Sequence, residues 1–555
     1  MTESAFKYRM GILGCPSYPH VAWNRQHLQK LKYMGFNTLQ LNLAWATRPA
    51  DEPLNLEDVV RMPTDEEVRL RGKTLPLSDP SPKRLEQRRR DLKNRIALCR
   101  EMGFRTVFHF GAPFVGDINI SDAPPNCILD GKTEERCLVL LRQLAQEFPG
   151  IDDILVYTYD QHAWLCNEFG PCPNCRGIPL HDRVVPFLES LSKQWRSLSP
   201  NGLLWWEPWE LSAGQFFGCL EVIDPKGFGL VLHSNIAEVM ATHVVDRWLR
   251  NACAIAEERG IPVVIEHWLG AATEELEPCT HLAFPLLTLR ALRSIFSLSG
   301  IAGIKEYYGL LPDRYDSSLE ATSLFFGNPQ ITDQEALGIL CRRFGEAGDL
   351  VAEFWKLGAA GMELFPWEGT WRFRRLATHG VAHTLEPAEI LGVPWHTPSW
   401  SSTRRSIFMK VEDGASDPWM LEDIQLRCQM AANKWEKALQ VGEVAAGLLP
   451  QSCKAEFESG LKELRMIQKV ALRYALHLRE TNVAYVMRAY MEDEGRIPEK
   501  CILEMQKLLQ RDLKNQEGNK EIEEALLILR ENPRGFLERY FRTSTNVPEK
   551  LQVIN

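Results

Sequence analysis

Long apolar runs and blocks of basic residues are both missing from this chain. No apolar run reaches the roughly 18 residues that a membrane-spanning helix requires. The 555 residues include 64 Lys and Arg against 73 Asp and Glu, which gives a net charge of −9. This balance argues against nucleic acid or an anionic membrane surface as a partner. The first residues, MTESAFKYRMG, lack the basic-then-apolar pattern of a signal peptide, so we expect a cytoplasmic protein.

Motifs of several enzyme classes are absent as well. The chain has no G-x-G-x-x-G motif, no P-loop and no Gly-rich phosphate loop, so we expect chemistry that requires no cofactor. Internal repeats, low-complexity tracts and a sustained heptad pattern are also missing. The composition, 45% hydrophobic and 25% charged, is that of a globular protein, and the length predicts two or three domains.

The chain does contain eight short, near-continuous apolar runs in its first 310 or so residues. They cover residues 8–14, 38–45, 105–111, 153–160, 202–210, 228–234, 261–268 and 301–308. Apolar runs without polar alternation are typical of parallel strands that are buried on both faces. Most are followed by a helix-patterned stretch, such as 23–34 or 183–198. The predicted fold class is therefore α/β, a (β/α)8 TIM barrel followed by a C-terminal α-helical domain.

Three domains follow from this pattern. Residues 1–312 form the catalytic barrel, 313–417 a helical and Trp/Pro-rich extension that packs on it, and 418–555 a C-terminal helical bundle. Within the barrel, residues 211–227 are predicted to be a Gly/Phe-rich connection. Leu, Ala and Met at spacings of three and four predict long amphipathic helices in the bundle, over 419–444, 454–490, 498–515 and 519–530. A homodimer through these helices is an expected assembly.

Polar residues at the C-terminal ends of barrel strands predict the site, because catalytic residues of this fold lie at that face. Three carboxylates stand out there as catalytic candidates. Asp160 closes ILVYTYD, Glu207 lies within WWEPWE, and Glu266 closes PVVIE. Strand seven lies across the barrel mouth from strands three and four, so Glu266 can face an acid on the other side. Such a pair is what glycoside hydrolysis requires, one acid to protonate the leaving oxygen and one nucleophile or base.

Aromatic and polar side chains near the same strand ends are predicted to bind the substrate. Aromatic rings offer a flat apolar surface to the CH face of a sugar, and histidines can bind its hydroxyl groups. The candidates are Trp45, Arg48, His109, His162, Trp164, Trp206, Glu210, His233, Trp268 and Tyr307. The segment 46–80 is longer than an ordinary βα loop and is expected to form a lid or a pocket wall. Glu306 is a weaker acid candidate, because the adjacent Lys305 is a local partner for it.

One cluster stands out among the 14 cysteines, which otherwise suit buried thiols in a reducing compartment. Cys166, Cys172 and Cys175 lie within ten residues, in LCNEFGPCPNCRG, one ligand short of a closed zinc site. The fourth ligand of a structural zinc would come from elsewhere in the chain. Its candidates are Cys15, Cys127, Cys137, His162 and His181. The alternative is a loop with partly buried thiols and no metal.

On these residues the chain resembles the barrel glycoside hydrolases, in particular the loose group of family 20 hexosaminidase-like and α-glucuronidase-like proteins. In that group a strand-four acid is followed by a cysteine-bearing loop and a helix, and YDQHAWLCNEFGPCPNCRG followed by HDRVVPFLESLSKQW matches that order. RRFGEAGDLVAEFW is similar to the helical region after the barrel, and the Cys loop looks like the zinc-bearing loop of family 42 β-galactosidases. The resemblance covers about residues 8–365. Family 20 enzymes carry an adjacent Asp-Glu pair, whereas Gln161 follows Asp160 here, so only the position of the acid carries over.

The sequence therefore leads to the hypothesis of an exo-acting glycoside hydrolase of hexosaminidase-like or galactosidase-like type, with a carbohydrate substrate. Asp160 or Glu207 would be the general acid, and Glu266 the nucleophile or base. One alternative is a catalytically silent barrel that binds carbohydrate. Another is a metal-dependent barrel hydrolase, with zinc at the Cys cluster or at His109 and His233.

Overall fold

The computed structural model describes most of the chain. The described residues are 6–15, 17–43, 52–53, 55–61, 81–111, 127–157, 166, 168–208, 211, 213–233, 244–273, 276, 279–367, 418–515 and 519–540. They form two compact units. The first comprises Met1–Leu276 and Ala283–Leu340, and the second comprises Glu277–Leu282 and Cys341–Asn555.

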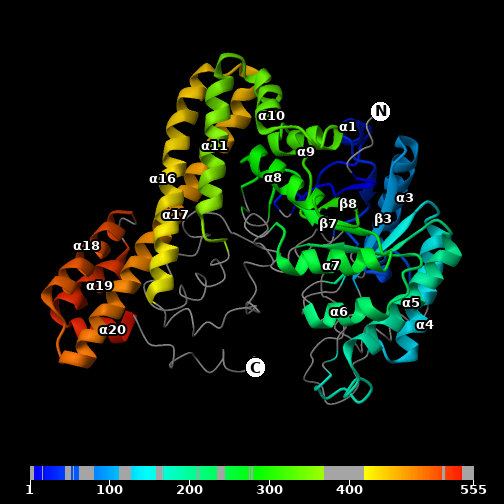
Figure 1. Cartoon of the computed structure of the whole chain (residues 1–555), viewed down its shortest axis with the longest axis horizontal. Coiled ribbons are helices and arrows are strands. Elements are labelled where there is room, and N and C mark those ends of the chain that lie inside the picture. The colour runs from blue at the N-terminus through cyan, green and yellow to red at the C-terminus, as the bar shows by residue number, and fades with distance from the viewer. Residues whose placement is uncertain are drawn as a thin grey trace. The chain divides into compact units, whose positions relative to one another are not determined.

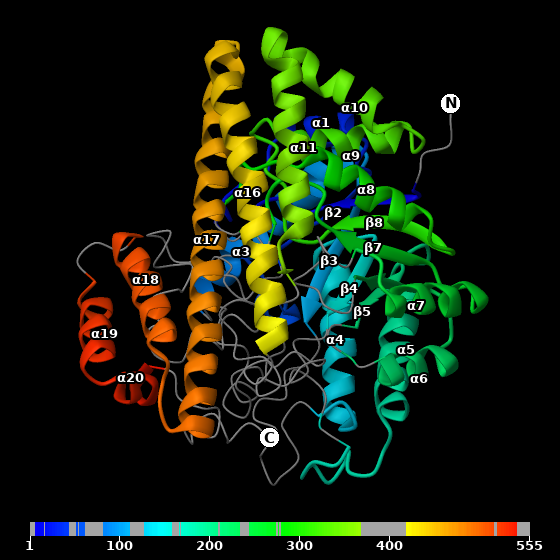
Figure 2. The ribbon, with the colours of Figure 1, turned by 60° about the vertical axis from the view of Figure 1, so that its left-hand side comes forward.

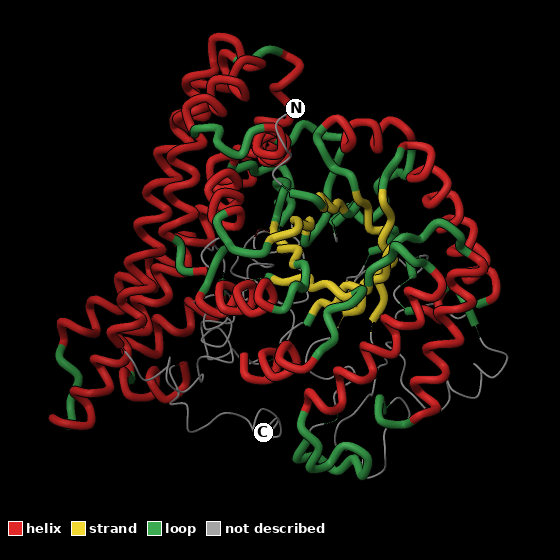
Figure 3. Tube along the Cα trace, turned by 45° about the vertical axis from the view of Figure 1, so that its right-hand side comes forward, coloured by secondary structure: helices red, strands yellow, loops and turns green. Residues whose placement is uncertain are grey.

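The first unit is built on a closed barrel of eight parallel strands in sequential order (Figures 1 and 3). The strands are β1 (Tyr8–Gly11), β2 (Thr38–Gln40), β3 (Arg105–Gly111), β4 (Asp153–Tyr157), β5 (Leu204–Glu207), β6 (Phe228–Leu232), β7 (Val263–His267) and β8 (Ile301–Glu306). β8 pairs with β1, which closes the ring. All eight predicted strands are confirmed. Most end before their apolar runs do, because the last residues of the runs leave the ladder and begin the βα loops.

Alternation of side chains explains why the runs are apolar throughout. Alternate residues fill the barrel interior, among them Val107, Leu155, Trp205, Val231 and Val264. The residues between them face the surrounding helices. One face of each strand therefore builds the inner core and the other builds the strand–helix core, so neither can be polar. At the C-terminal strand ends the inward positions become polar.

Helices follow the strands around the ring. They are α1 (Arg25–Tyr33), α3 (Pro82–Met102), α4 (Gly131–Glu147), α5 (Leu180–Leu198), α6 (Ala213–Val222), α7 (Arg247–Glu258) and α8 (Pro285–Phe296), with a short turn η1 (Leu56–Asp58), and then α9 (Ser317–Gly327) and α10 (Asp333–Leu340). The expectation of a mere connection over 211–227 is wrong, because α6 occupies most of it. Its glycines hid a helix whose Phe216, Cys219 and Leu220 are buried.

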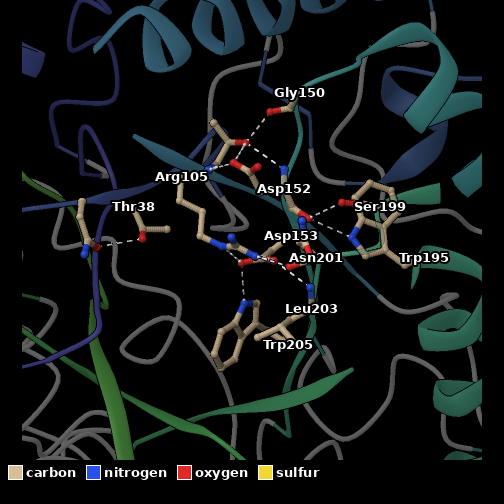
Figure 4. Close-up of polar contacts among 12 residues, drawn as sticks. Thr38, Arg105, Gly150, Asp152, Asp153, Trp195, Ser199, Asn201, Leu203 and Trp205 are labelled. Carbon is tan, nitrogen blue, oxygen red and sulfur yellow. Dashed lines mark hydrogen bonds and ion pairs between the residues drawn. The ribbon is translucent and has the colours of Figure 1, made fainter. Parts of the chain in front are cut away.

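At the N-terminal end of the strands, the barrel is filled by the Arg105–Asp153 ion pair and the indole ring of Trp205. Asp153, at the start of β4 and fully buried, accepts hydrogen bonds from Arg105 Nε at 2.7 Å, Leu203 N at 2.8 Å and Trp205 Nε1 at 3.1 Å (Figure 4). The Trp205 ring packs edge-on against Tyr8, with centroids 5.1 Å apart. These contacts link β3, β4 and β5, and the side chains involved fill the barrel interior below the polar strand ends.

The second unit is helical. It contains η4 (Cys341–Ala347), α11 (Gly348–Leu364), α16 (Pro418–Leu448), α17 (Gln451–Glu494), α18 (Glu499–Asn515), α19 (Lys520–Glu531) and α20 (Pro533–Tyr540). α11, α16 and α17 run side by side, as Figure 2 shows. The four long helices predicted from the sequence are confirmed. No helix in the described part of the chain is both long and apolar enough to span a membrane.

A short piece of chain between β7 and α8 also belongs to the second unit. Glu463 of α17 accepts hydrogen bonds from the backbone N–H groups of Thr280 at 3.2 Å and His281 at 2.7 Å. The His281 ring lies 2.8 Å from the same carboxylate through Nδ1. Thr280 and His281 are thus held by contacts with a side chain of the same unit.

Candidate active site

Two of the three predicted catalytic carboxylates lie together at the C-terminal ends of the barrel strands. Glu207 ends β5 and Glu266 is the fourth residue of β7, and both are almost fully buried. The remaining one, Asp160, lies outside the described residues. So do five of the predicted substrate-binding residues, which are Trp45, Arg48, His162, Trp164 and Glu210.

Lys305 of β8 is the third charged group of the site. Residues Glu266 and Lys305 are direct neighbours in the β7–β8 ladder, and the Lys305 ammonium forms an ion pair with Glu266 Oε1. Only 3% of the Lys305 side chain is exposed. Lys305, expected to be a local partner of Glu306, forms its ion pair with Glu266, while its charge also acts on the pKa of Glu306. Glu306 instead accepts hydrogen bonds from the backbone N–H groups of Leu269, Tyr308 and Gly309 at 2.7–2.9 Å.

The two carboxyl groups lie close enough to share a hydrogen bond, which requires one of them to carry a proton. Burial and the negative charge of Glu266 raise the pKa of Glu207 well above its usual value. Burial alone would also raise the pKa of Glu266, but the charge of Lys305 and the contact with His233 outweigh it and lower that pKa to about 2. The directions of the two shifts favour a proton on Glu207 and a negative charge on Glu266. Two neighbouring carboxyl groups with separated pKa values are typical of an acid/base pair.

His109, within β3, and His233, directly after β6, both border the carboxyl pair. His233 Nδ1 lies 3.4 Å from Glu266 Oε2, and His109 Nε2 lies 3.8 Å from Glu207 Oε2. Burial, together with the charge of Lys305, lowers the pKa of His109 to about 3, so its imidazole is neutral. A neutral ring can exchange a hydrogen bond with a hydroxyl group or a carboxyl group without adding charge.

Residues on and just after β2 hold His109 in place. The Asn42 side chain forms two hydrogen bonds with the backbone of His109. Its Oδ1 accepts from His109 N at 3.0 Å, and its Nδ2 donates to His109 O at 2.7 Å. Gln40 Nε2 lies 3.5 Å from His109 Nδ1. Sequence reasoning missed Gln40, Asn42 and the role of Lys305. A polar residue inside an apolar strand was the signal that could have identified all three.

The predicted aromatic residues have different locations. Trp268 and Tyr307 lie in a cluster with Tyr157 and Tyr308, close to the strand ends. Trp206 does not join them. Its fully buried ring faces outward from β5 and packs against Phe216 of α6 at a centroid distance of 5.6 Å. Inward and outward positions alternate along β5, so Trp205 and Glu207 point into the barrel and Trp206 belongs to the strand–helix core.

The cysteine cluster has a fourth member. Cys127, in the loop between β3 and α4, joins Cys166, Cys172 and Cys175 of the loop between β4 and α5. Their four buried sulfurs all lie within 4.8 Å of one another, and Cys127 Sγ is 3.4 Å from Cys175 Sγ. A tetrahedral zinc ion with Zn–S bonds of about 2.3 Å separates its sulfurs by about 3.8 Å, so this set fits the metal.

The other candidates for the fourth ligand lie elsewhere or outside the described residues. Cys15 packs in the aromatic cluster of Trp268, and Cys137 is buried on α4. His181 lies 3.5 Å from Asp182 through its ring, and His162 is outside the described residues. Three-dimensional proximity of two βα loops thus selects Cys127, which the sequence could only name among five.

Comparisons with known proteins rest on structure alone. No protein-family model matches the chain, and no curated protein matches it by sequence. Among solved structures it is similar to a GH138 enzyme targeting pectin rhamnogalacturonan II, at 10% identity and a TM-score of 0.56. The match covers 92% of this chain and 61% of that one, so the chain spans less than two thirds of its length. At this identity the likeness shows the fold, a TIM barrel that a glycoside hydrolase also uses.

Two further solved structures match over most of this chain. A mutant of the Thermobaculum terrenum O-GlcNAc hydrolase matches at 12% identity, with 96% of both chains covered and a TM-score of 0.44. CpGH84D matches at 9% identity, with 95% of this chain and 69% of that chain covered and a TM-score of 0.37. At these TM-scores neither likeness carries an argument about the fold.

Proposed function

We propose that this chain is an exo-acting glycoside hydrolase in which Glu207 is the general acid and Glu266 the nucleophile or base. The observation that carries the proposal is the pair itself, two buried carboxyl groups at the face of the barrel where this fold performs chemistry, of which Glu266 is paired with Lys305 and Glu207 has a raised pKa. The exo mode rests on the length of the segment 46–80 after the second strand, which is expected to restrict the cleft. A hexosaminidase-like or galactosidase-like activity is the finer form of the proposal.

The chemistry needs a proton donor and an anion on either side of a glycosidic bond. Glu207 would protonate the leaving oxygen, while Glu266 would attack the anomeric carbon or activate a water molecule. Hydrogen-bonded carboxyl groups lie closer than the roughly 5 Å that retaining enzymes need and the roughly 6.5 Å or more that inverting enzymes need. Substrate binding would therefore have to part the pair. Asp160 stays an alternative general acid.

The decisive test is a screen of aryl glycosides and pectin oligosaccharides, the latter because the GH138 neighbour targets pectin. Wild type is compared with Glu207→Gln, Glu266→Gln and Asp160→Asn. Loss of an acid or a nucleophile should lower kcat by at least about 100-fold. Glu258→Gln, on the exposed surface of α7, is the matched control and should keep full activity. Near-wild-type rates in both Glu207→Gln and Glu266→Gln would show that the site is misplaced.

Two rival functions are tested in the same series. A silent carbohydrate-binding barrel would bind sugars in titration calorimetry and hydrolyse none of the substrates. A metal-dependent hydrolase would lose turnover on chelation even when circular dichroism shows an unchanged fold. The two-carboxylate proposal expects turnover to persist after chelation for as long as the fold does.

We also propose a structural zinc ion held by Cys127, Cys166, Cys172 and Cys175. Two groups support such a site around the sulfurs. Asn174 Nδ2 lies 3.9 Å from Cys127 Sγ, and the buried Arg183 guanidinium donates to the backbone carbonyl of Cys166. A positive charge there would offset part of the net negative charge of a tetrathiolate zinc site. The metal would tie the loop after β3 to the loop after β4, where Asp160 lies in the sequence.

Metal analysis tests this zinc site without reference to activity. The purified protein should contain one zinc ion per chain by mass spectrometry. Cys127→Ser should lower that content and the thermal midpoint, whereas Cys137→Ser, another buried thiol on α4, should keep the zinc. A wild-type protein that stays zinc-free after refolding with zinc would exclude the proposal.

A further inference from the structure

Lys305 is an unusual residue for the interior of a barrel. Lysine is almost never fully buried unless its charge is paired, because transfer of an ammonium group out of water is costly. Here only 3% of the side chain is exposed, at the end of β8. Its charge is matched by Glu266, the neighbouring inward side chain of β7. A buried cation whose partner is a proposed catalytic group calls for a functional explanation.

Both oxygens of the Glu266 carboxylate face a nitrogen. Lys305 Nζ donates to Oε1, and His233 Nδ1 lies 3.4 Å from Oε2. The Lys305 ammonium also lies 3.4 Å from the backbone carbonyl of Glu306, which fixes its direction. The cation is therefore directed at Glu266, the neighbour of Lys305 in the ladder, and this makes the surroundings of the two carboxyl groups unequal.

The charged and titratable groups facing the pair come from three strands among the described residues. Lys305 is on β8, His233 follows β6 and His109 is on β3, while Glu306 adds a carboxyl next to Lys305 in sequence. One ammonium balances one carboxylate, which leaves the second carboxyl to keep its proton. Without this cation, the proton shared by two carboxyl groups in contact would be distributed between them, because their surroundings would not favour either group.

We infer that Lys305 is a positioning residue, which fixes the negative charge on Glu266 and thereby the shared proton on Glu207. Lys305 would then decide which carboxyl is the acid and which is the nucleophile or base. This inference deepens the proposed function and rests on it for its catalytic meaning. Its physical content, the place of the proton, holds independently of any substrate.

The pairing also argues against Lys305 as a Schiff-base nucleophile. Such a lysine must lose its proton to attack a carbonyl group. Burial alone would lower the pKa of Lys305, but the carboxyl groups around it, first among them the Glu266 carboxylate, outweigh burial and raise that pKa, so the ammonium form is held. The lysine therefore acts through its charge.

The first measurement follows the carboxyl pair by carbon-13 NMR of protein labelled at the Glu carboxyl carbon. The two signals are identified by their absence from the Glu207→Gln and Glu266→Gln spectra. In wild type, the carboxyl carbon of Glu266 should keep the chemical shift of an ionised carboxylate from about pH 4 to pH 8. The carboxyl carbon of Glu207 should show the chemical shift of a protonated carboxyl group at the acidic end of this range. In Lys305→Met, the titration of Glu266 should move up by at least about one pH unit, because an adjacent opposite charge shifts a carboxyl pKa by about one to three units.

Lys305→Arg is the matched control, since it keeps the charge and should restore most of the wild-type titration. If Lys305→Met does not fold, Lys305→Gln keeps a donor without the charge and should show the same upward shift. An unchanged Glu266 titration in the folded neutral variant would overturn the inference. So would an Arg variant that titrates like the neutral one.

The second measurement separates this inference from the proposed function. On an active substrate, the acidic limb of kcat/KM against pH should move upward in Lys305→Met by the same amount as the NMR titration. If no glycoside is hydrolysed, the proposed function fails, yet the NMR titration still decides the inference. If glycosides are hydrolysed and the acidic limb stays in place, only the inference fails.

Discussion

Replacing the two carboxyl groups of the site one at a time should change stability very unequally. Glu266→Gln removes the carboxylate that pairs with Lys305, and it leaves behind an ammonium whose side chain is only 3% exposed. Breaking a buried ion pair by removing one partner costs about 3–5 kcal/mol. Glu207→Gln keeps a hydrogen-bond donor for Glu266 and replaces the carboxyl group to which we assign the proton. Its cost should stay below about 1 kcal/mol, since the exchange is nearly isosteric.

Urea unfolding followed by tryptophan fluorescence measures this difference, because Trp205 lies in the barrel interior beneath the site. We expect Glu266→Gln to unfold at clearly lower urea than wild type and Glu207→Gln to unfold close to it. The double variant Lys305→Met/Glu266→Gln should recover stability over Glu266→Gln, since no uncompensated charge remains. Equal losses in the two single variants would refute the assignment of charge within the pair. A double variant no more stable than Glu266→Gln would refute it as well.

Three further predictions concern the barrel around the site. Trp206→Ala should cost about 3–5 kcal/mol of stability, as large aromatic truncations in a core do, and should leave KM for an active substrate unchanged in folded protein. Gly229→Ala should destabilise the barrel by about 1–3 kcal/mol by overpacking, because its Cβ would lie 2.5 Å from two ring atoms of Trp205, whereas the open position Gly338→Ala should not. Burial lowers the pKa of His267 from 6.5 to about 4, so the folded state binds fewer protons than the unfolded state between these two values. Stability should therefore fall as pH drops through this window, by up to about 3 kcal/mol from this group, and thermal melts of His267→Phe should show a flatter pH dependence.

The barrel could be predicted from the sequence because strands buried on both faces have a simple signature. Arg105–Gly111 was predicted with its observed bounds, and even 228–234, preceded by a Gly/Phe-rich segment, contains a strand. The helix Ala213–Val222 escaped prediction because glycine and phenylalanine weaken a helical pattern that tertiary packing restores.

The site was predictable only in part. Glu207 and Glu266 were found because strand ends in a barrel converge at one face. The inward direction of Trp205 and outward direction of Trp206 depend on the phase of alternation, which a run apolar on both faces does not reveal. The partner of Lys305 depends on register between two strands, and the fourth cysteine on the path of two loops. Neither quantity is encoded locally in the sequence.

The segment 277–282 has a practical consequence for dividing the chain. Because these six residues belong to the helical unit while the residues on both sides belong to the barrel unit, no single cut separates the two. A fragment that starts at residue 341 would leave the Glu463 carboxylate without the backbone N–H groups of Thr280 and His281. A fragment that ends at residue 340 would carry that segment without its helical partners. The helical unit is in this sense interleaved with the barrel along the chain, and gene fragments designed at a linear boundary would each inherit an incomplete unit.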